Sequence, residues 1–174
     1  MKALSLIIAA CLSLTTPLLH AQDEPAPEIA PEVVDALFGN HATIAAFTDA
    51  VQFAEQAGLE KQVLIEAEIQ YYLFRNTDLA SIRKLVRKID TLAGAFDPDA
   101  SRLFKSKNQF LAMGEYAKAI IALQSEDEAS LKKHITEAIW LAPENAQNFA
   151  SLIRSYRGMK EQRARRASDA EKAQ

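Results

Sequence analysis

The chain has 174 residues, 49% of them hydrophobic, with a formal net charge of −3 and only 5 Gly and 6 Pro. This length allows one domain with a substantial core, and the scarcity of helix breakers beside abundant Ala, Leu, Glu and Lys predicts an all-α protein. Cys11 is the only cysteine and lies in a segment that we expect to be removed, which excludes disulfides and cysteine-based metal sites from the mature protein.

Residues 1–21 have the pattern of a secretory signal peptide. An apolar run extends from Ala3 to Leu14, and Ala21 supplies the small residue of a cleavage site. We expect cleavage near Ala21, and therefore a periplasmic or secreted protein. Two alternatives stay open. The run is short for a membrane span but could be retained as an anchor, or Cys11 could be lipidated, because the residues before it resemble a lipoprotein box.

Residues 22–30 contain two Pro and three acidic residues and almost nothing to bury, which predicts a disordered leader. Pro31 suits the first position of a short helix that continues to Phe38. In the next predicted helix the apolar residues recur three and four positions apart, and Gly58 is expected to end it. This stripe consists of Ile44, Phe47, Val51 and Ala54.

Between Leu59 and Arg75 the apolar residues occupy two faces of one predicted helix. The first stripe consists of Leu64, Ala67, Tyr71 and Phe74, and the second consists of Ile65, Ile69 and Tyr72. A helix that is apolar on two faces packs between neighbours. We therefore expect this helix in the middle of the fold.

The segment 76–78, with the sequence Asn-Thr-Asp, is expected to cap the following helix. The apolar residues of that helix are Leu79, Ile82, Val86, Ile89, Ala93 and Phe96, the most regular stripe in the sequence. Asp97 and Pro98 are then expected to cap and open a further helix that breaks at Gly114. Its inward residues are expected to be Leu103, Phe110 and Leu111.

Ser125 stands three residues before Glu128, the spacing of a capping box, which predicts a helix start near Ser125. Pro143 is expected to end this helix. The inward residues of this helix are Leu131, Ile135, Ala138 and Ala142, and those of the last predicted helix are Phe149, Leu152, Ile153 and Tyr156. The apolar pattern stops beyond Met159. We therefore assign the helical domain to residues 31–160 and a basic, flexible tail to residues 161–174.

These patterns predict six or seven antiparallel helices joined by short turns. Within residues 113–145, the segment from Gly114 to Ile120 resembles the turn between the helices of a tetratricopeptide repeat (TPR), and Ile135 to Asn145 resembles its second helix. The resemblance implies stacked helical hairpins that bind a protein or peptide. The helix junctions at Pro98 and Pro143 are 45 residues apart, whereas TPR motifs repeat every ~34 residues. We therefore expect a TPR-like stack, not a regular array.

Charge is distributed unevenly along the mature chain. From Arg154 onward seven basic and three acidic residues give a formal charge of +4, and the mature body before them carries −8. The helix after residue 78 also carries a basic stripe, which consists of Arg83, Lys84, Arg87 and Lys88. This stripe could bind phosphate, lipid head groups or an acidic partner. Alternatively it is a solvated helix face that pairs with Glu66 or Glu68.

Three aromatic residues are candidates for contact with a partner. Tyr71 and Tyr72 could line a groove, although aromatic residues at helical spacing are usually part of a core. Trp140 lies off the apolar stripe of its helix, so we expect it to face either the next hairpin or a partner.

Catalytic and metal-binding signals are absent from the sequence. His41 and His134 are the only histidines of the predicted mature chain, and Ser130 and Ala138 stand four residues from His134, where a second ligand would be needed. No Gly-rich phosphate loop, nucleophile elbow or zinc motif is present. We expect no enzymatic activity, no cofactor and no metal site.

Three functions agree with these patterns. The leading hypothesis is a non-enzymatic, exported TPR-like module that binds an unidentified protein or peptide of the bacterial envelope. The second is a bundle that holds a small molecule or lipid among Tyr71, Tyr72, Phe74 and Trp140. The third is a polyanion or membrane-surface adaptor, bound only peripherally through the basic stripe and the tail. Export argues against nucleic acid as a partner, and the sequence leaves the oligomeric state open.

Overall fold

The computed structural model describes residues 30–75 and 78–172. All regular structure in these residues is helical, which confirms the predicted all-α class. The helices are α1 (Pro31–Leu37), α2 (Ile44–Gln56), α3 (Lys61–Phe74), α4 (Leu79–Leu92), α5 (Lys107–Gln124), α6 (Glu128–Leu141), the short 3-10 helix η1 (Pro143–Asn145) and α7 (Ala146–Lys172). The predicted signal peptide, Cys11 and the leader as far as residue 29 lie outside the described residues.

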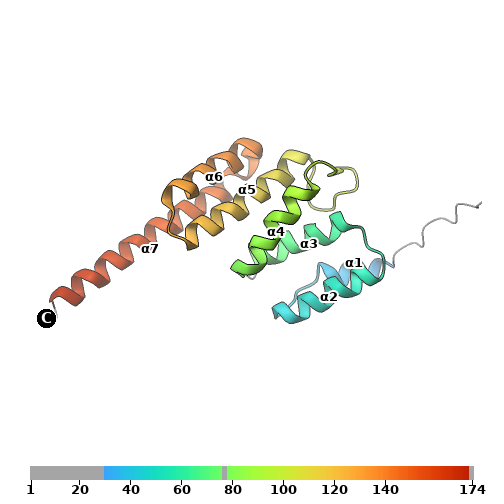
Figure 1. Ribbon diagram of the computed structural model, residues 1–174, viewed down its shortest axis with the longest axis horizontal. Coiled ribbons are helices and arrows are strands. Elements are labelled where there is room, and N and C mark those ends of the chain that lie inside the picture. Colours follow the sequence, from blue (N-terminus) through green and yellow to red (C-terminus); the bar gives the residue numbers. More distant parts are fainter. Residues whose placement is uncertain (1–29, 76–77, 173–174) are drawn as a thin grey trace, which may run out of the picture.

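The helices follow one another through space in the order of the sequence (Figure 1). Each helix from α1 to α6 contacts the next one, and α5 and α6 share the most extensive contact. α7 packs against both α6 and α5 and then extends beyond them (Figure 1). As a result, α1 and α2 lie at one end of the molecule and the C-terminal part of α7 lies at the other.

α3 is the central helix of the fold. Its side chains are buried on almost every face, from Gln62 to Leu73, and it contacts both α2 and α4. This confirms the prediction that a helix with two apolar stripes packs between neighbours. Phe74, in its last turn, is the exception, because 58% of this residue is exposed.

Two aromatic clusters contribute to the core. Phe47 of α2 stacks on Tyr71 of α3, with the ring centroids 4.1 Å apart, and meets Tyr72 edge-on at 5.4 Å. Phe96, just after α4, stacks on Phe110 of α5 at 4.3 Å. Aromatic pairs in such geometries contribute about 0.5–1.5 kcal/mol beyond the burial of their area. The first cluster therefore stabilises the packing of α2 on α3. The second stabilises the packing of the α4–α5 connection on α5.

The predicted C-terminal end of α2 and the predicted start of α4 are confirmed. Gly58 follows α2 with a φ of +83°, a backbone conformation that glycine adopts without a steric penalty. At the start of α4, the side chain of Asp78 accepts a hydrogen bond of 2.8 Å from the backbone N–H of Ser81. The buried face of α4 consists of Ile82, Leu85 and Ile89.

The connection between α4 and α5 corrects one prediction. No helix opens at Pro98, because residues 96–106 are irregular and α5 begins only at Lys107. Ser106 caps α5, and its hydroxyl accepts a hydrogen bond of 3.2 Å from the backbone N–H of Gln109. Leu103, which was expected to point inward, is 39% exposed.

Two buried polar side chains of α3 explain why this connection is not helical. Gln62 donates to the backbone carbonyl of Asp97 at 2.7 Å and accepts from its backbone N–H at 3.0 Å. Glu66, which is fully buried, accepts from the backbone N–H groups of Arg102 and Leu103 at 2.9 and 3.2 Å. These contacts satisfy backbone groups that would otherwise need partners within a helix. These hydrogen bonds join residues that are far apart in the sequence, so local sequence signals do not reveal them.

Gly114 does not break a helix, which corrects a second prediction. α5 runs without interruption from Lys107 to Gln124, and the segment that resembled a turn between TPR helices lies inside it. Gly114 is buried where α4 and α5 cross, and a Cβ atom added there would lie 3.0 Å from Cγ2 of Ile89. The glycine therefore allows close packing of two helices.

The start of α6 corrects a third prediction. Ser125 ends α5, and Glu126 follows in the left-handed region with a φ of 57°. The N-cap of α6 is Asp127, whose carboxylate accepts a hydrogen bond of 3.0 Å from the backbone N–H of Ser130. The capping-box spacing from Ser125 to Glu128 was therefore fortuitous, because an Asp two positions later makes the same contact.

Substitutions at these two positions should separate the roles of Ser125 and Asp127. Asp127→Ala removes the N-cap of α6 and should lower the free energy of unfolding by about 1 kcal/mol. Ser125→Ala should change it by less than about 0.5 kcal/mol, because this surface position caps no helix start. Urea unfolding followed by circular dichroism measures both. A larger effect from Ser125→Ala would restore the capping-box interpretation.

α7 is longer than predicted. It buries Phe149 and partly buries Leu152, Ile153 and Tyr156, as expected. The helix does not end at residue 160, however, because it continues to Lys172. The predicted tail of residues 161–174 therefore begins within a helix, and α7 carries most of the basic residues of the C-terminal region.

Candidate functional site

The basic stripe is a surface feature of α4. Arg83, Lys84, Arg87 and Lys88 are all exposed. The ammonium of Lys88 lies 2.5 Å from a carboxylate oxygen of Glu68 on α3, so one of the four residues makes the pairing with a neighbouring helix that was considered for the stripe. The other three side chains form no ion pair within the described residues. Such exposed cations are solvated and screened, so each of them contributes little to stability.

The four aromatic candidates do not come together. Tyr71 and Tyr72 are buried in the core against Phe47, whereas Phe74 stacks loosely on Tyr116 at 6.1 Å and points to the surface. Trp140 is 75% exposed on α6, so it does not pack against a neighbouring hairpin. The structure therefore offers no shared pocket for these aromatic rings.

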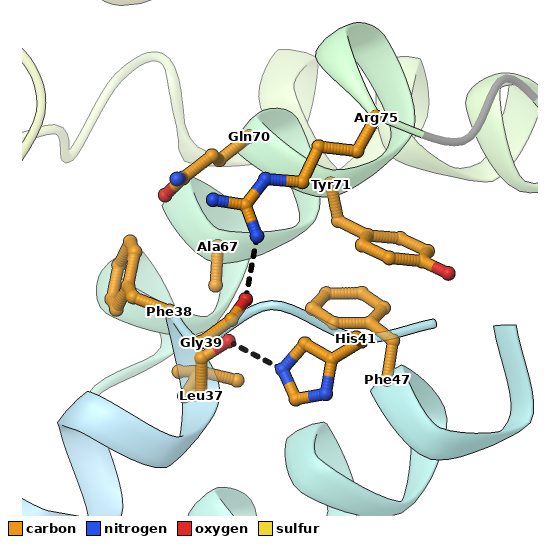
Figure 2. A pocket seen from close by; sticks show the side chains of 9 residues that line it. All are labelled: Leu37, Phe38, Gly39, His41, Phe47, Ala67, Gln70, Tyr71 and Arg75. Carbon is orange, nitrogen blue, oxygen red and sulfur yellow. Dashed lines mark hydrogen bonds between the residues drawn. The ribbon is translucent and has the colours of Figure 1, made fainter. Parts of the chain in front are cut away.

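A small cavity lies between the α1–α2 connection and α3 (Figure 2). The guanidinium of Arg75 donates to the carbonyl of Gly39 at 2.7 Å, and Nε2 of His41 lies 3.2 Å from the carbonyl of Leu37. The cavity has a volume of only about 10 Å³, which is too small for anything larger than one water. We interpret it as a packing gap where α1, α2 and α3 meet, not as a binding site.

A much larger groove of about 390 Å³ lies between α3, the α4–α5 connection, α5 and the start of α7. Its lining consists of Ile69, Gln70, Phe74, Leu103, Phe104, Lys105, Gln109, Met113, Asn145, Asn148 and Phe149. Its volume lies in the range of about 300–1,000 Å³ that is typical of ligand sites. We call this feature the groove.

Aromatic and aliphatic side chains dominate the lining of the groove, and the polar members are mostly amides. The side chain of Gln109 is already engaged, because it donates to Glu144 at 2.6 Å and accepts from the backbone N–H of Lys105 at 2.7 Å. The side-chain amides of Gln70, Asn145 and Asn148 form no hydrogen bond with the described part of the chain. Neither does the ammonium of Lys105. The groove therefore presents several unused donors and acceptors beside apolar surface.

The position of the groove depends on the tie between α3 and the α4–α5 connection. Glu66 binds the backbone at Arg102 and Leu103, and the connection then supplies Leu103, Phe104 and Lys105 to the wall. On the opposite side, the contact between Gln109 and Glu144 joins α5 to η1. Both ties are contacts within the chain itself, and they fix the position of the walls of the groove.

A cluster of titratable groups lies away from the groove, where α4, α5 and α6 meet. Glu115 of α5 accepts from Lys118 at 2.9 Å, and its other oxygen lies 2.7 Å from Nδ1 of His134 on α6. Lys118 also lies 3.4 Å from Asp90 of α4. Residue spacing along α6 does not reveal Glu115 as the partner of His134, because Glu115 belongs to a different helix.

Ion pairing shifts the pKa values in this cluster. Burial opposes ionisation of Glu115, but hydrogen bonds from Lys118 and His134 outweigh it and hold the pKa of the carboxyl below its usual value. Burial likewise opposes the charge on Lys118, but the contacts with Glu115 and Asp90 raise its pKa overall. The cluster therefore links helices through charges, and its contribution should depend on pH.

Glu115→Gln should lower the free energy of unfolding by about 0.5–1 kcal/mol near neutral pH, because these charges are partly screened by solvent. The carboxyl has a lower pKa in the folded protein, so its contribution is present above the unfolded pKa and is lost as the pH falls through the folded pKa. The difference between wild type and variant should therefore shrink from about pH 5.5 to about pH 3. Urea unfolding at both pH values tests this, with the exposed Glu137→Gln as control.

Other site chemistries receive no support from the described part of the chain. In residues 30–75 and 78–172 no group of three His, Cys, Asp or Glu side chains is placed to hold a metal ion. Over the same residues, no helix combines the length and the apolar character needed to cross a bilayer. The lining of the groove contains no carboxylate, histidine, serine or cysteine, and its one charged side chain is that of Lys105.

Sequence reasoning missed the groove almost completely. Of its lining, only Phe74 was considered for ligand contact, and Ile69, Leu103 and Phe149 were expected to belong to apolar, inward-facing stripes. The run Asn145 to Asn148 contains three amide residues and could have drawn attention to the start of α7. No pattern along the chain, however, predicts that Asn145 and Asn148 line the same groove as Gln70 and Phe74 of α3.

Comparison of the chain with protein-family models, with curated proteins and with solved structures finds no match in any of the three. The likeness of residues 113–145 to TPR proteins therefore stays a prediction.

Proposed function

We propose that this protein is an exported, TPR-like interaction module of the bacterial envelope, and that it binds an extended peptide segment of a partner in the groove. The observation that carries the proposal is the combination of unpaired amides with exposed aromatic surface in one groove. The signal-like residues 1–21 support export. Sequencing the N-terminus of the protein from its host tests that part, with a start at Gln22 as the expected result.

The chemistry of the groove suits a peptide backbone. An extended peptide presents alternating N–H and C=O groups that need partners when they leave water. The amides of Gln70, Asn145 and Asn148 can donate and accept at once. The rings of Phe74 and Phe104 and the side chain of Leu103 offer apolar surface to the peptide's side chains. Lys105 favours a segment that carries a carboxylate near one end.

Walls that are held in place also favour binding energetically. Glu66 ties α3 to the α4–α5 connection, and Gln109 ties α5 to η1, so little conformational entropy is lost in ordering the walls. Micromolar affinity is the expected scale, since a groove of this size covers only a few residues of a peptide.

Selection from a displayed library of random peptides tests the proposal. Peptides should be recovered, and Gln70→Ala combined with Asn148→Ala should weaken them about tenfold, because two hydrogen bonds of roughly 0.7 kcal/mol each are lost. Gln147→Ala is the matched control, since Gln147 is exposed beside Asn148 but does not line the groove. Failure to select any peptide, or equal losses in the control, would contradict the proposal.

A small apolar ligand is the second candidate, and the volume of the groove favours it. Native mass spectrometry of protein purified from its host distinguishes the two. A bound lipid or metabolite that is released on denaturation, and that competes with selected peptides, would favour the ligand carrier.

A further inference from the structure

One end of the molecule is acidic. Residues 30–60, which include α1 and α2, contain five acidic residues and no Lys or Arg: Glu32, Asp35, Asp49, Glu55 and Glu60. All five are exposed, and none forms an ion pair within the described residues. Lys61 and Arg75 lie next to this segment and change its formal charge from −5 to −3. We call residues 30–60 the acidic end.

The opposite end is basic. α7 carries seven basic and three acidic residues, a formal charge of +4. Lys160 and Arg163 pair with Glu128 and Glu126 and hold α7 against the start of α6. The other basic side chains of α7 that the structure describes are exposed and unpaired; they are Arg154, Arg157, Arg165 and Arg166.

Each end also exposes apolar surface among its charges. Phe53 on α2 is 57% exposed and lies one turn after Asp49. Met159 on α7 is 39% exposed and lies one turn before Arg163. Charge alone gives weak association, whereas charge around an apolar contact can fix both partner and orientation.

α7 lacks a helix beside its C-terminal part. Beyond Arg163, no hydrogen bond or ion pair connects the described residues of α7 to another helix. A helical segment of this length is only marginally stable in water by itself. A contact that covers this part of α7 would therefore stabilise it.

We propose that the acidic end binds the basic part of α7 in a second copy of this chain, so that molecules associate head to tail. The two ends lie at opposite extremes of the molecule (Figure 1), so one copy cannot bring its own ends together. Each copy offers one acidic and one basic surface. A contact of this kind is heterologous and produces chains or closed rings. It leaves the groove free and does not depend on the proposed peptide binding.

Charge reversal at each end provides the test. The head variant combines Asp35→Lys, Asp49→Lys and Glu55→Lys, and the tail variant combines Arg157→Glu, Arg165→Glu and Arg166→Glu. All six positions are exposed and unpaired, so both variants should keep the helical circular dichroism of the wild type. Analytical ultracentrifugation of the chain in the form that accumulates in cells measures the mass of each protein and of their equimolar mixture.

The wild type should at least double its average mass with rising concentration at about 0.05 M salt and lose this association at about 0.5 M salt. Each variant alone should stay monomeric, because its two ends then repel each other. The mixture should associate again, since every head then meets a tail of opposite charge. A wild type that stays monomeric, or a mixture that does not recover association, overturns the proposal. If the wild type is monomeric and its α7 binds vesicles of anionic phospholipid, the proposal is also overturned, because the partner of α7 is then a membrane.

Discussion

Glu66→Ala should lower the free energy of unfolding by about 3–4 kcal/mol, a large part of the stability of a domain of this size. The substitution leaves two backbone N–H groups, those of Arg102 and Leu103, without their acceptor, and it opens a cavity in α3. Each of these part-buried donors costs about 1 kcal/mol when it loses its partner, and removal of the fully buried Glu66 side chain adds the cost of the cavity. The α4–α5 connection should also become accessible to protease, because Glu66 is one of its two anchors.

Glu68→Ala is the matched control, two residues along the same helix. The side chain of Glu68 is 10% exposed and that of its partner Lys88 is 45% exposed. Lys88 can return to water when Glu68 is removed, so the loss should be about 1 kcal/mol. Urea unfolding followed by circular dichroism gives both values, and limited proteolysis reports on the connection. Equal losses for the two variants would show that Glu66 does not hold the connection.

Gly114→Leu should lower the free energy of unfolding by about 2–3 kcal/mol, although leucine is a better helix former than glycine. The new side chain would enter the crossing of α4 and α5, where even a Cβ atom lies only 3.0 Å from Ile89. The two helices must then separate or Ile89 must leave its rotamer. Either change weakens packing in the core.

The same substitution at Gly158 should raise the free energy of unfolding instead of lowering it. Gly158 lies within α7, and nothing lies within 4 Å of a Cβ atom added there, so Gly158→Leu should raise stability by about 0.5–1 kcal/mol through helix propensity. Thermal unfolding of both variants makes the comparison. If Gly114→Leu were also stabilising, α4 and α5 would not cross as closely as described.

Local signals in the sequence predicted most of the helices. The periodicity of apolar residues placed α2, α3, α4 and the first part of α7 correctly, and the cap at Asp78 and the stop at Gly58 were both recognised. These features depend only on residues within one or two turns of each other. Side-chain periodicity therefore carries most of the information on helix position.

The errors occurred where a distant residue decides the local structure. Pro98 has the composition of a helix start, but Gln62 and Glu66 hold the following backbone in an irregular form. Gly114 is a helix breaker by propensity, but the close approach of Ile89 requires it inside α5. In both cases tertiary packing overrides propensity.

The groove could not be predicted for the same reason. Gln70, Lys105 and Asn148 lie far apart along the chain, and each has the ordinary appearance of a surface residue in its own segment. Only the tertiary structure brings them to one groove. The aromatic candidates Tyr71 and Trp140 do not line it, because Tyr71 is buried on the apolar stripe of α3 and Trp140 is exposed on α6.

Recognition of a peptide in the groove is tested most directly by backbone NMR of the labelled protein titrated with a selected peptide. We expect the largest shift changes at Gln70, Lys105, Asn145 and Asn148, with little change around Trp140 on α6 or along the basic stripe of α4. Shifts that instead cluster at Trp140 or at Arg83 and Arg87, with the groove unaffected, would contradict the proposed site.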